Sequence, residues 1–168
     1  MMPQLLDIFW NGGESKMKEV LNGVELNDRQ LKEILRVLKM LPSVDVCCSV
    51  QLPKYATAGS GGEGLVKVEL TRISQVSKSL SGISGGMGGA YTPFFPKQKE
   101  EGWWLVLGDA QSGELIALRR ILFQSKTLTS TLTFDIPERP GKYEYQLYFI
   151  SDTYLGLDQQ YSVSFEIK

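Results

Sequence analysis

The sequence predicts a mainly β protein, a seven-stranded β-sandwich preceded by a small helical segment. Apolar residues recur every three to four positions before Pro42, as in a helix, and every second position from Val44 onward, as in strands. Turn residues separate seven such alternating segments, which is the pattern of a sandwich. We therefore expect two regions, a helical segment over 1–42 and a sandwich over 43–168.

The best-defined helix is expected between Asn27 and Pro42. Its apolar stripe repeats at i, i+3, i+4 and i+7 and consists of Leu31, Ile34, Leu35 and Leu38. Asn27 precedes the stripe as an N-cap, and Gln30 follows at the spacing of a capping box. Two shorter helices are expected over 3–9 and 14–21, separated by glycine-containing turns. Helices this short cannot bury their apolar faces alone, so they must pack on the sandwich or on another part of a larger protein.

Seven strands are expected after Pro42. They lie around residues 44–50, 66–71, 103–107, 114–120, 128–136, 143–149 and 161–167. The third strand is a continuous apolar run that begins with Trp103 and Trp104. Neighbouring side chains on a strand point to opposite faces, so one tryptophan enters the core and the other lies on a second face. A large aromatic on that face indicates a contact with another element or a partner.

Tyr143 indicates the type of sandwich. It follows Pro140-Gly141 at the start of the sixth strand, which is the place of a tyrosine corner in immunoglobulin-like and fibronectin-III-like domains. Tyr145 would then take the position that antibody domains give to a cysteine. The alternative is that Tyr143 is an ordinary half-buried strand aromatic.

Composition excludes several functions. The 18 basic and 19 acidic residues give a net charge of -1, so we expect no autonomous strong nucleic-acid binding. No apolar run approaches the roughly 20 residues that span a bilayer, and we expect no membrane partner. The chain has no histidine, which removes Ser-His-Asp and Cys-His catalysis. Its two cysteines, Cys47 and Cys48, supply too few ligands for structural zinc, so we expect neither metal nor cofactor.

Two glycine-rich stretches and four carboxylates are candidate catalytic elements by residue type. Residues 59–64 contain G-x-G-x-x-G, but a β pattern follows instead of a helix, and 82–89 matches no phosphate-binding loop. We interpret both as loops. The carboxylates lie in expected turns, and we interpret each as solvated rather than as part of an acid–base pair; they are Glu100, Glu101, Asp152 and Asp158.

The candidate interaction surface combines the tryptophan pair with a basic patch. Lys97 and Lys99 precede the tryptophans, and Arg119-Arg120 lies on the next strand. The two arginines point to opposite faces, so at most one joins the patch. The alternative is a solvated edge. We therefore predict the surface from Trp103, Trp104, Lys97, Lys99 and Arg119.

Three runs carry a resemblance to a known family, namely 95–109, 114–120 and 147–161. They resemble the C-terminal immunoglobulin-like domain of the Sec-type unit in tandem-cassette DExH RNA helicases. The relatives of that type are the spliceosomal helicase that unwinds small nuclear RNAs and the helicase subunit of the activating signal cointegrator complex. Residues 1–42 resemble the preceding helix-loop-helix piece more weakly, and the 82–89 loop departs from the family pattern.

The resemblance implies a module that is not itself an enzyme. Helicase motifs such as the P-loop are absent from this sequence. The expected partners are the helicase cassette of the parent protein and other protein subunits. The expected location is the nucleus, with the cytoplasm as a second location. Two alternatives stay open. One is the equivalent module of the endoplasmic-reticulum translocation J-protein, which shares the Trp-Trp pair. The other is a weak single-stranded RNA binder that uses Lys97, Lys99 and Arg119.

Overall fold

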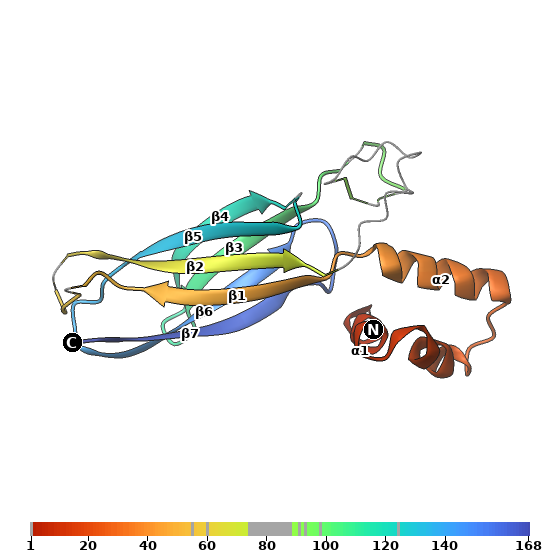
Figure 1. The fold of residues 1–168 in the computed structure, drawn as a ribbon, viewed down its shortest axis with the longest axis horizontal. Coiled ribbons are helices and arrows are strands. Elements are labelled where there is room, and N and C mark those ends of the chain that lie inside the picture. Colours follow the sequence, from red (N-terminus) through yellow and green to blue (C-terminus); the bar gives the residue numbers. More distant parts are fainter. Residues whose placement is uncertain are drawn as a thin grey trace.

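The computed structural model describes residues 2–54, 56–59, 61–73, 89–90, 92, 94–97, 99–123 and 125–168. Two helices precede seven strands in this part of the chain (Figure 1). The elements are α1 (Met2–Leu21), α2 (Asp28–Met40), β1 (Val44–Gln51), β2 (Glu63–Arg72), β3 (Gly102–Asp109), β4 (Glu114–Leu122), β5 (Thr127–Asp135), β6 (Gly141–Ser151) and β7 (Gln159–Ile167). The expected loop at 82–89 lies, apart from Gly89, outside the described residues.

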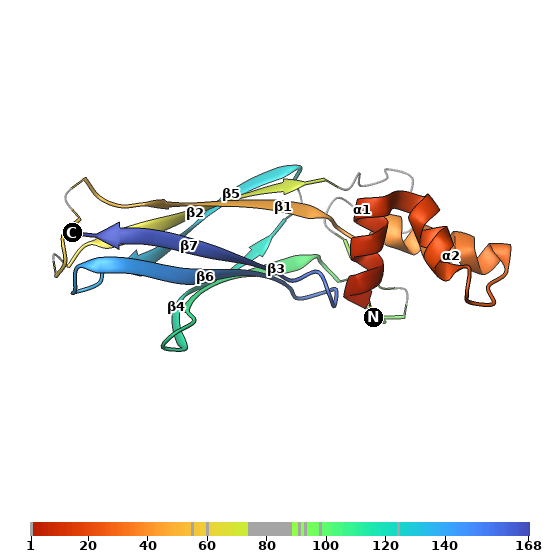
Figure 2. The ribbon, with the colours of Figure 1, turned by 90° about the horizontal axis from the view of Figure 1, so that it is seen from below.

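The strands form two antiparallel sheets that pack face to face as a sandwich. One sheet has the order β1-β2-β5 and the other the order β4-β3-β6-β7. Figure 2 shows the two sheets as separate layers. In the constant-type immunoglobulin arrangement the fourth strand joins the sheet of the first, second and fifth. Here β4 lies beside β3 in the opposite sheet, so the expected mainly β, immunoglobulin-like fold is confirmed with its fourth strand on the larger sheet.

The core lies between the sheets and follows from the alternation of the sequence. On β3, Trp103, Leu105 and Leu107 are buried, and they belong to one hydrophobic cluster with buried residues of the neighbouring β6 and of β2 in the other sheet. The Trp103 ring stacks on Phe149 with ring centroids 4.2 Å apart and planes inclined by 6°. Aromatic pairs and apolar burial of this kind supply most of the driving force for packing two sheets.

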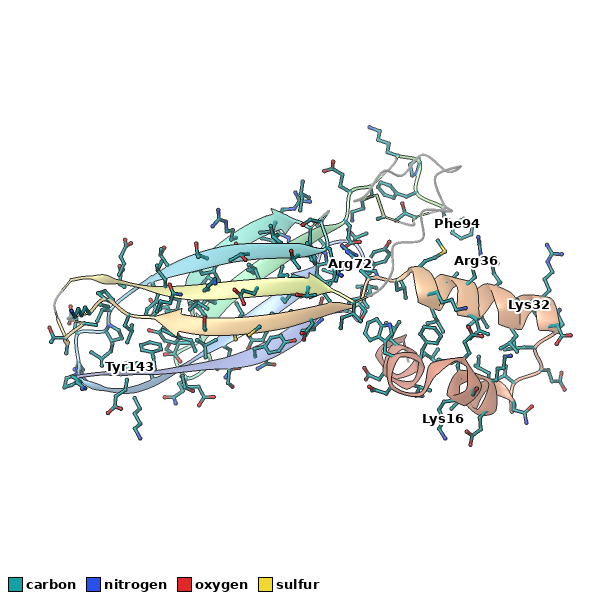
Figure 3. All side chains as sticks on the ribbon, in the orientation of Figure 1. Lys16, Lys32, Arg36, Arg72, Phe94 and Tyr143 are labelled. Carbon is teal, nitrogen blue, oxygen red and sulfur yellow. The ribbon has the colours of Figure 1, made fainter. Side chains whose placement is uncertain are left out.

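The tyrosine corner expected from the sequence is present. The Tyr143 hydroxyl donates a hydrogen bond of 2.8 Å to the backbone carbonyl of Arg139, four residues upstream. Its ring stacks beside Phe165 on the neighbouring strand. Figure 3 shows Tyr143 at the end of the sandwich away from the helices, and Arg72 at the end near them.

The helices pack on each other beyond one end of the sandwich (Figures 1 and 2). Helix α1 is continuous from Met2 to Leu21 except at Gly13, whose φ of 67° is not helical. The expected break is therefore a kink at one glycine, a residue that adopts positive φ without steric cost. Asn27 caps α2 in a capping box with Gln30, as the sequence indicated. Buried apolar residues join the two helices, namely Leu6, Met17, Leu35 and Leu38.

Candidate interaction surface

The structure separates the two tryptophans. Trp103 is 1% exposed and belongs to the core, so it is not available to a partner. Trp104 lies on the outer face of the four-stranded sheet and is partly exposed. This is the alternation that the sequence indicated, and the core takes the first tryptophan. Of the pair, only Trp104 remains as a surface residue.

An apolar patch surrounds Trp104 on the outer face of β3 and β6. Trp104 stands opposite Ile150 in the strand register, and Val106 stands opposite Tyr148. All four are partly exposed. We call these four residues the outer patch. Directly opposed side chains of neighbouring strands contact one another, so the four form one continuous surface.

The outer patch departs from the pattern of a solvated sheet face. An antiparallel sheet with one wet face alternates apolar and polar residues. β3 and β6 instead carry apolar runs at 103–107 and 147–150, so both of their faces are apolar. Sequence reasoning found Trp104 but missed Val106, Tyr148 and Ile150. The signal that could have found them was the second continuous apolar run, in β6.

An ion pair bounds the outer patch at the end of the sheet nearest the helices. Arg120 Nε and Nη2 donate to Asp152 Oδ2 at 2.9 and 2.7 Å. The pair passes over Gly102, where an added Cβ would lie 2.3 Å from Asp152 Oδ2 and 2.5 Å from Arg120 Nη2. Only glycine leaves room for this crossing. Lys99 completes the cluster, since its Nζ donates to the Asp152 carbonyl at 2.7 Å.

The Asp152 carboxylate has a shifted pKa. Burial raises the pKa, but hydrogen bonds from Thr153 and Arg120, together with the charges of Arg120 and Lys99, lower it by more. The net result is a pKa below the ordinary value of 3.8. Asp152 is therefore an ionised carboxylate held by cationic neighbours, and it joins β6 to β4 and to the 99–101 connection.

The predicted basic patch does not gather in one place. Lys99 bonds Asp152, whereas Arg119 Nη1 donates to the Thr131 carbonyl of β5 at 3.0 Å. Lys97 is exposed in the connection before β3. Arg120, the neighbour of Arg119, is the arginine that shares Asp152 with Lys99. The two arginines thus point to opposite faces of β4 and bind different partners.

The expectation for Glu101 was wrong. Glu101 is not in a solvated turn but is 6% exposed and pairs with Arg72. Arg72 Nη2 lies 2.6 Å from Glu101 Oε1, which also accepts a hydrogen bond of 2.9 Å from Trp103 Nε1. Arg72 further donates to the Phe123 carbonyl. The spacing of 29 residues between Arg72 and Glu101 hides this pair from local sequence patterns.

Two further findings limit the chemistry of the described residues. Within the part of the chain that the structure describes, no group of three or more Cys, Asp or Glu side chains is placed to hold a metal ion. No described helix is long and apolar enough to cross a membrane. The arrangement that these residues do offer is a surface, made of an apolar patch with charged groups at its end.

Comparison with known proteins gives one family and a consistent set of relatives. Residues 3–164 match the family model of the Sec63 Brl domain. The U5 small nuclear ribonucleoprotein 200 kDa helicase of Homo sapiens is 34% identical over 145 residues, which cover 86% of this chain and 6% of that protein. Activating signal cointegrator 1 complex subunit 3 of Homo sapiens is 54% identical over 74 residues, which cover 44% of this chain and 3% of that protein. The Bos taurus counterpart is 34% identical over 167 residues, which cover 85% of this chain and 7% of that protein.

Proposed function

The chain belongs to the Sec63 Brl domain family, and we propose that it is a non-catalytic structural and protein-interaction module at the C-terminal end of a large RNA helicase. Its place would be the nucleus, in pre-mRNA splicing or in an activating signal cointegrator complex. ATP hydrolysis would belong to the helicase cassette of the parent protein. The chain spans only 6% of the U5 helicase relative, which supports a role as one part of a larger assembly.

The outer patch carries this proposal. Trp104, Val106, Tyr148 and Ile150 form an apolar surface on a sheet whose opposite face is already packed in the core. Contiguous exposed apolar surface marks sites of protein contact, and a central tryptophan is a frequent anchor of such contacts. The occupant that we propose is the helicase cassette of the same polypeptide, with further protein subunits beside it.

The first test concerns the parent protein. We expect the coding region upstream of Met1 to encode a helicase cassette continuous with this chain. Sequencing that region decides the point. A J domain with membrane spans upstream would instead assign the module to the translocation machinery. The helicase proposal is refuted if no helicase cassette is found upstream.

The second test concerns the outer patch itself. Trp104→Ala is expected to weaken docking of the chain to the separately expressed cassette by at least roughly thirtyfold, since anchor residues contribute about 2 kcal/mol or more. The substitution removes surface contact rather than core packing, so the folded state should persist. Titration calorimetry measures the docking, and circular dichroism and urea unfolding check the fold.

Leu65→Ala is the matched control for Trp104→Ala. Leu65 is also partly exposed, but it lies on β2 in the three-stranded sheet. The Leu65→Ala variant should bind the cassette with the same affinity as the unmodified chain. Equal docking by the Trp104→Ala variant would refute the role of the outer patch. Salt-dependent binding of single-stranded RNA by the isolated chain would favour the RNA-binding alternative, and we expect none because the basic residues lie apart.

A further inference from the structure

Among the residues that the structure describes, no strand pairs with the outer side of β4, so β4 is an open edge of the four-stranded sheet. Asp152 N donates to the Gly102 carbonyl, so the backbone groups of Gly102 face β6 and those of the next residue, Trp103, face β4. Trp103 pairs with Ile121. The residues that alternate with Ile121 therefore turn their N–H and C=O groups out of the sheet. They are Leu118, Arg120 and Leu122.

A groove separates this edge from the open edge of the other sheet. It has a volume of about 420 Å³ and is lined by residues 119–122 of β4 and 128–131 of β5. Ile136 N donates to the Gly62 carbonyl, so every second residue of β5, counted back from Ile136, directs its backbone N–H and C=O groups toward β2. Thr131 lies between two of these residues, and its outward carbonyl accepts the hydrogen bond from Arg119. Arg119 thus reaches across the groove.

The β4 edge is apolar, unlike the other edge of the same sheet. Leu115, Leu118 and Leu122 are 58%, 52% and 40% exposed. At the opposite edge, the outward-pointing side chains of β7 include polar ones, such as those of Gln160 and Ser162. Proteins protect exposed strand edges with charged side chains, proline or a covering element, because an open edge pairs readily with another strand. β4 contains no proline, and its charged residues are Glu114, Arg119 and Arg120.

The charge of the groove indicates what chemistry would cover the edge. Arg120 is neutralised by Asp152. Arg119 has a backbone carbonyl as its hydrogen-bond partner, and no carboxylate within the described ranges forms an ion pair with it. A partner carboxylate would add an opposite charge and two acceptor oxygens for the guanidinium, which a backbone carbonyl cannot offer.

We infer that β4 accepts an extended acidic segment of a protein partner as an added strand. The added strand bonds the outward backbone groups of Leu118, Arg120 and Leu122. Its apolar side chains lie beside the two leucines on the outer face, and its alternate acidic side chains enter the groove beside Arg119. This site goes beyond the docking proposed above, because it uses the outward backbone groups of β4 and Arg119 in the groove. Leu118 and Leu122 lie on the same outer face as Trp104, at its β4 edge.

The test uses the whole chain and a synthetic nine-residue peptide that alternates valine and glutamate. We expect the peptide to shift the backbone amide signals of Leu118, Arg120 and Leu122 in nuclear magnetic resonance spectra and to slow their hydrogen exchange. A peptide that alternates valine and lysine should bind at least roughly tenfold more weakly, because like charges across an interface are strongly unfavourable.

Two pairs of variants locate the site. Arg119→Glu should weaken the valine–glutamate peptide at least roughly tenfold, whereas Lys142→Glu makes the same charge change at an exposed position of β6 and should not. Leu118→Lys should also weaken it. Its control is Gln160→Lys, which alters the same cross-strand row at the opposite edge of the sheet.

The outcomes separate this inference from the proposed function. Trp104→Ala should leave peptide binding intact, so failure of cassette docking and failure of peptide binding are independent results. Absence of binding by the valine–glutamate peptide at about 1 mM, or equal binding by the valine–lysine peptide, overturns the inference. Concentration-dependent dimerisation that protects the β4 amides also overturns it, in favour of a second copy as the occupant.

Discussion

The Arg72–Glu101 ion pair is a charged contact with both side chains 8% exposed. Each charge has additional partners. Trp103 donates to Glu101, and Arg72 both donates to the Phe123 carbonyl and lies over the Phe123 ring at 4.9 Å. Buried charges are tolerated only when they are paired and hydrogen-bonded in this way. The hydrogen bond from Trp103 Nε1 to Glu101 also gives the buried indole a polar partner.

Glu101→Gln tests the importance of this pair. The substitution leaves Arg72 buried without a counter-charge, so we expect the free energy of unfolding to fall by about 3–5 kcal/mol. Urea unfolding measures it. Glu69→Gln is the control, because its ion pair with Lys67 is exposed and should cost no more than about 1 kcal/mol. Similar losses in the two variants would contradict a special role for the buried pair.

Asp152 makes stability depend on acidity. Folding lowers its pKa below 3.8, so the ionised carboxylate stabilises the fold above that pH, and the contribution is lost as the pH falls through the lowered value. Asp152→Asn should therefore unfold more easily than the unmodified chain at pH about 7, and the difference should shrink below pH about 4. Urea unfolding across this range measures both. A difference that stays constant with pH would contradict the linkage, and Asp45→Asn, exposed on β1, is the control.

Strands β3 and β6 show how one element serves two surfaces. Their inward side chains fill the core, and their outward ones form the outer patch. Both strands lie in the middle of their sheet, with β4 and β7 at its edges. A central strand has no free backbone groups to offer, so its outer face contributes side chains only. The edge strand β4 contributes backbone groups as well, which is why the two surfaces suit different partners.

The N-cap of α2 gives a prediction for a helix. Asn27 Oδ1 accepts a hydrogen bond of 2.9 Å from Gln30 N, and Gln30 returns one to Asn27 N. Asn27→Ala should lower the stability of α2 by about 1 kcal/mol. Amide hydrogen exchange within α2 measures the loss. Asn22→Ala makes the same change in the turn after α1 and should leave this exchange unaltered, whereas equal effects would contradict the capping role.

The molecule is elongated, with the helices beyond one end of the sandwich and the C-terminus at the other end (Figure 1). The helices contribute only a few buried residues, namely Leu6, Met17, Leu35 and Leu38, to the hydrophobic cluster that they share with the sandwich. The sandwich buries a much larger set of residues from both sheets. Short helices depend on tertiary packing, whereas a domain above roughly 100 residues buries enough surface to fold alone.

Separate expression of the two regions tests this division. Residues 43–168 should fold without the helices and show one cooperative urea transition. Residues 1–42 should be largely unfolded in isolation, because they lack a sufficient core. Circular dichroism and amide signal dispersion measure both. An unfolded 43–168 fragment would show that the helices complete the core of the sandwich.

Local sequence patterns predicted the strands and α2, but they divided α1 into two helices where the structure has one helix with a kink at Gly13. Alternating or continuous apolar residues predicted the seven strands, the spacing of Asn27 and Gln30 predicted the capping box, and Pro140-Gly141 before Tyr143 predicted the tyrosine corner. Each of these features depends on residues a few positions apart. Backbone geometry relates such residues directly, because side-chain direction repeats with the period of the helix or strand.

Contacts between residues far apart in the sequence follow from the packing of the two sheets. Arg72 forms an ion pair with Glu101, and Arg120 with Asp152. Arg119 donates a hydrogen bond to the Thr131 carbonyl, and β4 lies beside β3 at the edge of its sheet. The order of residues alone was enough to predict strands with two distinct faces and to place Trp103 and Trp104 on opposite faces. It did not determine the pairings, because they depend on sheet order and register, which arise when both sheets close over a common core.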